Sequence, residues 1–136
     1  MTGFKRTWTV RFSDTDPFGI AHYPRIVDTL HESSDMFMEE VGFPLWEISL
    51  DYDFGLPLVE IDFEFERPME AGDNIEITIT PTLGTRSLRF DYVARNEDGA
   101  VTFTGHETRV CASTDDVSSR DLPVELREAI EPYTEG

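Results

Sequence analysis

The spacing of apolar residues changes once along this chain, and that change limits the folds open to it. Between Pro24 and Val41, apolar side chains recur at steps of three and four residues, as they do on one face of a helix. From residue 59 to residue 113, apolar and polar residues alternate instead, which is typical of strands with one buried face. The sequence therefore predicts one long helix followed by about four antiparallel strands.

Short segments near the two ends complete the predicted order. The stretch TWTVRF alternates, with Trp8, Val10 and Phe12 on one face, and it predicts a first strand. The stretch LPVELREAIEPY predicts a short amphipathic helix with Leu122, Leu126 and Ile130 facing inward. The sequence thus predicts an α+β fold, in which a sheet of about five strands wraps around one long helix and a short C-terminal helix follows.

The segment from residue 59 to residue 66 alternates most strictly. Its apolar residues Val59, Ile61, Phe63 and Phe65 are interleaved with four acidic residues, so we expect one buried face and one solvated face. One helix cannot cover both faces of a five-stranded sheet, and open sheet edges invite pairing with other chains. A homodimer or homotetramer is therefore expected.

Length and composition suit a single domain. The chain has 136 residues, of which 39% are hydrophobic, so residues 1–136 can form one domain with a sizeable core. A single cysteine, Cys111, excludes an internal disulfide and fits a reducing compartment. No apolar run resembles a signal peptide or could span a membrane. We therefore expect a cytoplasmic protein that does not bind membranes.

The charge of the chain is strongly one-sided. The formal net charge is −17, and the acidic residues are spread along the chain rather than gathered in a tail. Such a surface repels itself at low ionic strength, whereas salt shortens the screening length to about 3 Å at 1 M. The composition resembles that of proteins from salt-accumulating halophiles. No basic stripe is present, so a nucleic-acid partner is not expected.

The stretch DTDPFGIAHYP, residues 14–24, gathers chemically active residues at the predicted start of the helix. Asp14 and Asp16 suit the capping of a turn shaped by Pro17 and Gly19, which is a purely structural explanation. The alternative is a carboxylate placed for chemistry, because unpaired N–H groups at a helix N-terminus carry partial positive charge. Of the two aspartates, Asp14 is the one that we expect to be structural.

Metal binding is not expected in this stretch. Asp14, Asp16 and Gly19 match the first, third and sixth positions of an EF-hand loop, but Phe18 and Arg25 occupy positions that need oxygen ligands. The three histidines of the chain also lack the spacing of metal ligands. The sequence therefore predicts neither a metal nor another cofactor.

The same stretch resembles the signature of hotdog-fold acyl-CoA thioesterases of the 4-hydroxybenzoyl-CoA thioesterase type. In that family a strand ends in Asp-x-Asp-Pro/Ala-x-Gly-Ile/Val, and aromatic residues then begin the central helix. The likeness continues in GFPLW (42–46), LVEIDFEFERPMEAGDNIEI (58–77) and GTRSLRFDYVARNEDGAV (84–101). The resemblance implies the hotdog fold and hydrolysis of acyl-CoA thioesters to a free acid and coenzyme A.

The resemblance also implies roles for particular residues. It places Asp16 as the catalytic carboxylate, acting as nucleophile or general base, and the backbone N–H of Tyr23 as the donor that holds the thioester oxygen. Gly19 falls at the glycine of close approach to the substrate. Arg86 and Ser87 fall near positions that meet the nucleotide part of coenzyme A in relatives.

His22 departs from the family pattern, because the 4-hydroxybenzoyl-CoA enzyme has an aromatic residue there. We expect His22 to line the substrate pocket or to position Asp16, and a plain packing or surface role is equally open. A hotdog hydratase or dehydratase is an alternative function, although there four residues separate the Asp from the His and here five do. A non-catalytic acyl-CoA-binding module is the second alternative. The identity of the acyl group is left open.

Overall fold

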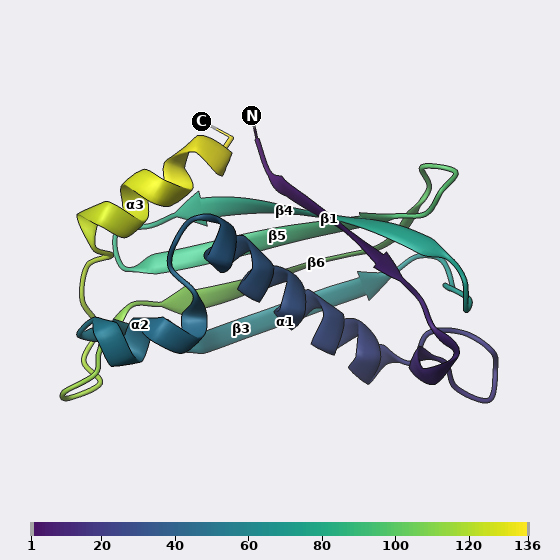
Figure 1. Cartoon of the computed structure of the whole chain (residues 1–136), viewed down its shortest axis with the longest axis horizontal. Coiled ribbons are helices and arrows are strands. Elements are labelled where there is room, and N and C mark those ends of the chain that lie inside the picture. Colours follow the sequence, from purple (N-terminus) through teal and green to yellow (C-terminus); the bar gives the residue numbers. More distant parts are fainter. Residues whose placement is uncertain (1, 136) are drawn as a thin grey trace.

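A long helix packed inside a curved antiparallel sheet dominates the computed structural model, which describes residues 2–135 (Figure 1). The sheet has the order β1-β4-β5-β6-β3. Its strands are β1 (Phe4–Thr9), β3 (Leu58–Phe65), β4 (Asn74–Leu83), β5 (Ser87–Arg95) and β6 (Val101–Val110). The helices are α1 (Tyr23–Glu40), α2 (Leu45–Asp51) and α3 (Val124–Ile130). The predicted α+β architecture is confirmed.

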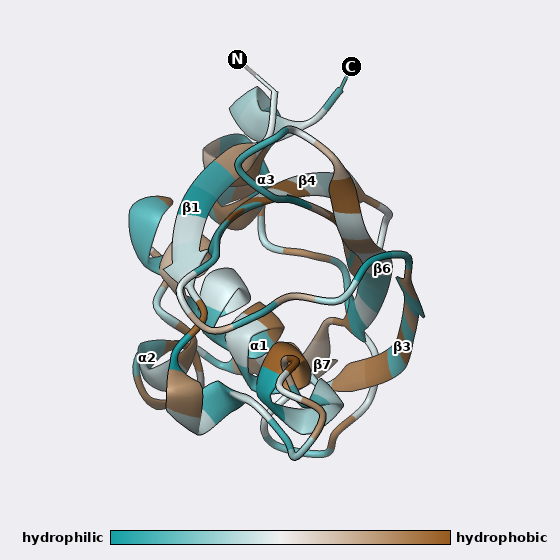
Figure 2. Ribbon diagram, turned by 90° about the vertical axis from the view of Figure 1, so that its right-hand side faces the viewer, coloured by the Kyte–Doolittle hydropathy of each residue, from teal (hydrophilic) through white to brown (hydrophobic). Residues whose placement is uncertain are grey.

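Helix α1 lies where its apolar stripe predicts. Pro24 stands in its first turn, and Gly42, with a φ of +90°, follows its last turn, so both ends carry residues suited to them. Its buried side chains include Ile26, Leu30 and Phe37. Figure 2 shows the sheet curving around this helix from β1 to β3.

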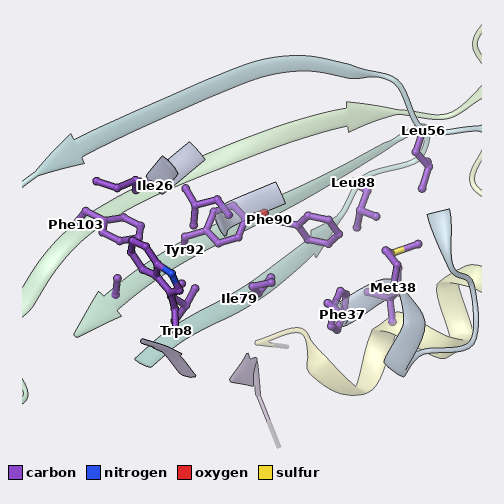
Figure 3. Close-up of a cluster of buried hydrophobic side chains, with 14 of the residues drawn as sticks. Trp8, Ile26, Phe37, Met38, Leu56, Ile79, Leu88, Phe90, Tyr92 and Phe103 are labelled. Carbon is purple, nitrogen blue, oxygen red and sulfur yellow. The ribbon is translucent and has the colours of Figure 1, made fainter. Parts of the chain in front are cut away.

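The core lies between α1 and the concave face of the sheet. Figure 3 shows Phe37 and Met38 of α1 near side chains that rise from the strands. The ring of Phe37 meets the ring of Phe90 edge-on at a centroid distance of 5.5 Å. The fully buried strand residues have the alternation that the sequence predicts; they are Ile75, Ile77, Ile79, Leu88, Phe90, Tyr92 and Phe103.

Strand β3 forms one edge of the sheet, and most of its expected buried face is open in this chain. It pairs with β6 on one side only. Val59 is 57% exposed, Ile61 43% and Phe65 53%, so the expected buried face is only partly buried in the single chain. Of the β3 residues, Phe63 is the one that packs against the core formed by α1 and the other strands in the described part of the chain.

Other local differences from the sequence-based expectation are small. Strand β1 ends at Thr9, and Phe12 lies in the short 3-10 turn η1 (Phe12–Asp14) with 86% of its surface exposed. Helix α2 forms where the sequence indicated only an end to the long helix. A two-stranded sheet of β2 (Phe54–Gly55) and β7 (Ala112–Ser113) was also not anticipated. The short 3-10 turn η2 (Glu131–Tyr133) follows α3.

Within residues 2–135, every helix is too short or too polar to cross a bilayer.

Candidate functional site

The loop between β1 and α1 is held in place by Asp14. One oxygen of this buried carboxylate accepts a hydrogen bond from the Arg11 N–H at 2.8 Å, and the other accepts one from Nε of Arg25 at 3.0 Å. The backbone oxygen of Asp14 accepts from the N–H of His22 at 2.8 Å. Both side-chain oxygens of Asp14 are thus engaged inside the protein, which is the structural role expected of this residue.

Asp16, two residues later, keeps one carboxylate oxygen free of hydrogen bonds to the described residues 2–135. Its Oδ1 accepts a hydrogen bond from the Phe18 N–H at 2.9 Å, and its backbone oxygen accepts from the Gly19 N–H at 2.8 Å. Gly19 adopts a φ of +79°, which a residue with a side chain rarely adopts, so the turn requires glycine here. The second oxygen, Oδ2, lies 3.8 Å from Nδ1 of His22, and 20% of the Asp16 side chain is exposed.

The N-terminus of α1 follows directly. His22 is the N-cap residue, and its carbonyl accepts hydrogen bonds from the N–H groups of Arg25 at 2.9 Å and Ile26 at 3.3 Å. Pro24 has no N–H. The N–H of Tyr23 has no hydrogen-bond partner among residues 2–135, so it is the donor that this helix end leaves available.

Asp16 and Tyr23 line the same cavity. Its volume is about 560 Å³, and most of its other walls are apolar side chains. The loop and α1 contribute Asp16, Ile20, Ala21, His22, Tyr23 and Ile26. The end of β3 contributes Phe65, and the connection from β3 to β4 contributes Glu66, Arg67, Pro68 and Met69. A carboxylate, an N–H donor at a helix end and an imidazole thus meet in one largely apolar cleft.

Asp16 also borders a second, more open cavity of about 720 Å³, which Phe12, Gly19 and Glu70 help to line. Asp16 therefore borders both hollows.

The opposite wall of the site could not be predicted from local sequence. Residues 65–69 reach the loop because Ile20 pairs with Glu70 in an isolated bridge and the Ala21 N–H donates to the Met69 carbonyl at 2.7 Å. No nearby motif signals this contact, since it joins segments almost fifty residues apart in the sequence. The apolar alternation of β3, which places Phe65 on the concave face, was the only indirect signal.

Arg86 and Ser87 lie far from this cavity within the chain. They stand at the turn between β4 and β5, and the ten residues of β4 separate that turn from the Asp16 end of the sheet. At about 3.3 Å per residue, this is a distance of about 30 Å. Arg86 is occupied locally, because its Nε lies 3.0 Å from Oδ1 of Asp121.

The structure therefore brings together four of the six candidate residues: Asp16, Gly19, His22 and Tyr23. It leaves Arg86 and Ser87 at the other end of the sheet. Across residues 2–135, no three histidine, cysteine or acidic side chains are grouped in a way that could hold a metal ion.

Comparison with known proteins gives consistent matches. The model of the thioesterase-like superfamily matches residues 10–130. A 1,4-dihydroxy-2-naphthoyl-CoA hydrolase from Crocosphaera subtropica is 31% identical over 91 residues, which are 66% of this chain and 66% of that protein. The chain thus spans just under two thirds of the length of that relative.

Two solved structures resemble the whole chain. A gentisyl-coenzyme A thioesterase is 30% identical with a TM-score of 0.80, covering 93% of this chain and 99% of the other. A member of the thioesterase superfamily from Jannaschia sp. is 27% identical with a TM-score of 0.89, covering 98% and 94%. The thioesterase-type hotdog fold implied by the sequence resemblance is therefore confirmed.

Proposed function

Because the chain belongs to the thioesterase-like superfamily, we propose that it hydrolyses acyl-CoA thioesters in the cavity between Asp16 and the N-terminus of α1. The observation that carries this proposal is the shared cavity itself. Asp16, with one carboxylate oxygen free of hydrogen bonds, and Tyr23, whose backbone N–H has no partner among the described residues, line the same largely apolar cleft. These are the two groups that thioester hydrolysis requires.

The Tyr23 N–H serves as the oxyanion donor. When the thioester carbon is attacked, negative charge develops on its carbonyl oxygen, and the partial positive charge at the helix N-terminus stabilises it. One such donor is worth about 3 kcal/mol of barrier in acyl-transfer enzymes. Pro24 removes the next donor, and the following N–H groups are bonded to His22, so the Tyr23 N–H supplies the hydrogen bond.

Asp16 supplies the attacking group by one of two routes. As a nucleophile, its free oxygen Oδ2 bonds to the thioester carbon, the C–S bond breaks, and coenzyme A leaves as the thiolate; water then hydrolyses the resulting anhydride. As a general base, the same oxygen takes a proton from a water that attacks the carbon. In both routes the Phe18 N–H holds Oδ1 and orients the carboxylate. His22 flanks Oδ2 and lines the cleft on which the acyl group lies.

A second copy of the chain completes the site in this proposal. β3 is an edge strand with exposed apolar residues on its concave side, and antiparallel pairing of two β3 strands about a twofold axis would cover them. Leu58, at the start of β3, and Ser87 stand at the same end of the sheet, since both pair with the end of β6. Antiparallel pairing therefore brings Arg86 and Ser87 of the second copy to the Asp16 end of the first.

In that position Arg86 is available for a phosphate of coenzyme A. Its guanidinium is 58% exposed and pairs with an exposed carboxylate, an interaction that a phosphate can replace. Ser87 begins β5 beside it and offers a hydroxyl. The nucleotide part of the substrate thus binds to one copy and the thioester to the other.

The test is an assay of free thiol release in molar salt with a panel of acyl-CoAs. The panel runs from short aliphatic to hydroxylated aromatic acyl groups, because two of the relatives above are named for hydroxylated aromatic substrates. Asp16→Asn should lower turnover about a hundredfold or more. Asp98→Asn, the same change in the exposed turn between β5 and β6, is the matched control. The proposal fails if no acyl-CoA is cleaved, or if Asp16→Asn retains full activity.

A further inference from the structure

The convex side of the free β3 edge carries a row of acidic residues. Glu60, Asp62 and Glu64 alternate with the apolar residues, so they face away from α1 while Ile61 and Phe65 lie on the concave side. The same edge strand thus has one face that favours association and one that is strongly negative.

Little positive charge offsets this acidic row. Nε2 of His106 lies 3.0 Å from Oε1 of Glu60. Arg89 lies in the same cross-strand row as Glu60, two strands away, and its guanidinium is bonded to Asp91 at 3.0 Å. In the part of the chain that the structure describes, Asp62 and Glu64 form no ion pair.

When β3 pairs with β3 of a second copy, the twofold symmetry determines which residues lie opposite the acidic row. Residues paired across two antiparallel strands point to the same face of the sheet. A register that keeps Ile61 and Phe65 of both copies on one common face, with the twofold axis between residues 61 and 65, therefore sets acidic residues opposite acidic residues. If the twofold axis passes through Asp62, the Asp62 side chains of the two copies lie opposite each other. Glu60 of each copy then lies opposite Glu64 of the other, which makes three pairs of like charges.

We propose that the pairing of two copies along β3 is switched by salt concentration, because the acidic row of one copy lies against the acidic row of the other. This inference rests on the dimer in the proposed function. Like charges directly opposite in a sheet destabilise the pairing, and salt screens that repulsion while leaving the apolar contacts of the concave side in place.

The size of the effect follows from the spacing. Two unit charges about 5 Å apart in water weaken association about fourfold, so three pairs weaken it about 70-fold. Molar salt, with a screening length of about 3 Å, reduces the combined penalty to about twofold. The dissociation constant of the dimer should therefore fall about 30-fold between dilute buffer and molar salt.

Sedimentation equilibrium across a salt series tests this inference, with far-UV circular dichroism at each salt to select conditions in which the chain is folded. The variant Asp62→Asn/Glu64→Gln removes the unpaired part of the acidic row. The control Glu125→Gln/Glu128→Gln removes the same charge from exposed positions of α3, away from the β3 edge (Figure 1). At the lowest salt at which all three proteins are folded, the β3 variant should dimerise about tenfold or more tightly than the control.

The outcomes separate the two proposals. A wild-type dimer whose dissociation constant does not change with salt overturns the salt switch and leaves the dimer standing. Equal affinities of the β3 variant and the α3 control at low salt also overturn it, since the salt effect would then come from net charge alone. A protein that is monomeric at every salt concentration refutes the dimer itself.

Discussion

Two aspartates only two residues apart should respond in opposite ways to the same substitution. Asp14 is buried with both carboxylate oxygens bonded inside the protein, whereas Asp16 has one oxygen free and a side chain that reaches the cavity. Asp14→Asn should therefore lower the stability of the fold. Asp16→Asn should leave the stability nearly unchanged and lower the activity.

The magnitudes follow from the hydrogen bonds. In Asp14→Asn, the amide oxygen can accept a hydrogen bond from only one of the two donors, the Arg11 N–H or Nε of Arg25. The amide NH₂ group then faces the other donor and cannot accept a hydrogen bond from it. Losing one charge-assisted bond costs about 1.5–3 kcal/mol. Arg25 is 47% exposed and can be solvated instead, so we expect about 2 kcal/mol. For 136 residues, the entropy of unfolding is about 0.29 kcal/mol/K, so the melting temperature should fall by about 7 °C.

Asp16→Asn should lower the melting temperature by less than about 2 °C, because the amide oxygen still accepts the Phe18 N–H. The measurement is thermal unfolding of wild type and both variants by circular dichroism at one molar salt concentration. The same preparations are then assayed for thiol release. If Asp14→Asn has the melting temperature of the wild type, or if Asp16→Asn is the less stable of the two variants, the roles assigned to these aspartates are wrong.

Three further predictions concern buried groups. Gly105→Ala should lower the free energy of unfolding, measured in urea, by about 2 kcal/mol, because the new Cβ would lie 2.6 Å from the Asp62 carbonyl oxygen and against the Phe63 ring. An unchanged free energy of unfolding would contradict the packing of β3 on β6. Burial raises the pKa of the Tyr92 hydroxyl well above its usual value, so the native state resists deprotonation that the unfolded chain undergoes. Stability should fall as the pH rises above about 10, and Tyr92→Phe should flatten that decline. Burial also raises the pKa of the Cys111 thiol, so a disulfide reagent should modify this thiol about a hundredfold more slowly in the native protein than in denaturant. Equal rates of modification would place the thiol at the surface.

Local signals in the sequence were sufficient for the parts of the fold whose causes are local. Helix α1 runs from Tyr23 to Glu40, one residue from the predicted bounds at each end, because Pro24 and Gly42 suit its two ends. The apolar alternation in β4 and β5 likewise identified buried positions correctly. Helix α2 was missed because seven residues after Pro44 are too short a run to show helical spacing.

The alternation of apolar and polar residues does not show which other element packs on each strand. Ile61, Phe63 and Phe65 of β3 do share a face, as the sequence indicated, but Phe63 alone of the three packs against the core in the described residues. The candidate site also has one part that local sequence predicts and one part that it does not. Asp16, Gly19, His22 and Tyr23 belong to one continuous segment, so their proximity follows from a single turn. The wall formed by Phe65 and the residues after it depends on strand order, which has no local signal.

A crystal structure of Asp16→Asn with an uncleaved acyl-CoA bound would show where the thioester lies. We expect the thioester carbonyl oxygen about 3 Å from the Tyr23 N–H nitrogen and the carbonyl carbon about 3–3.5 Å from the side chain at position 16. A thioester bound in another cavity, or with its carbonyl pointing away from the N-terminus of α1, would rule out the proposed mechanism.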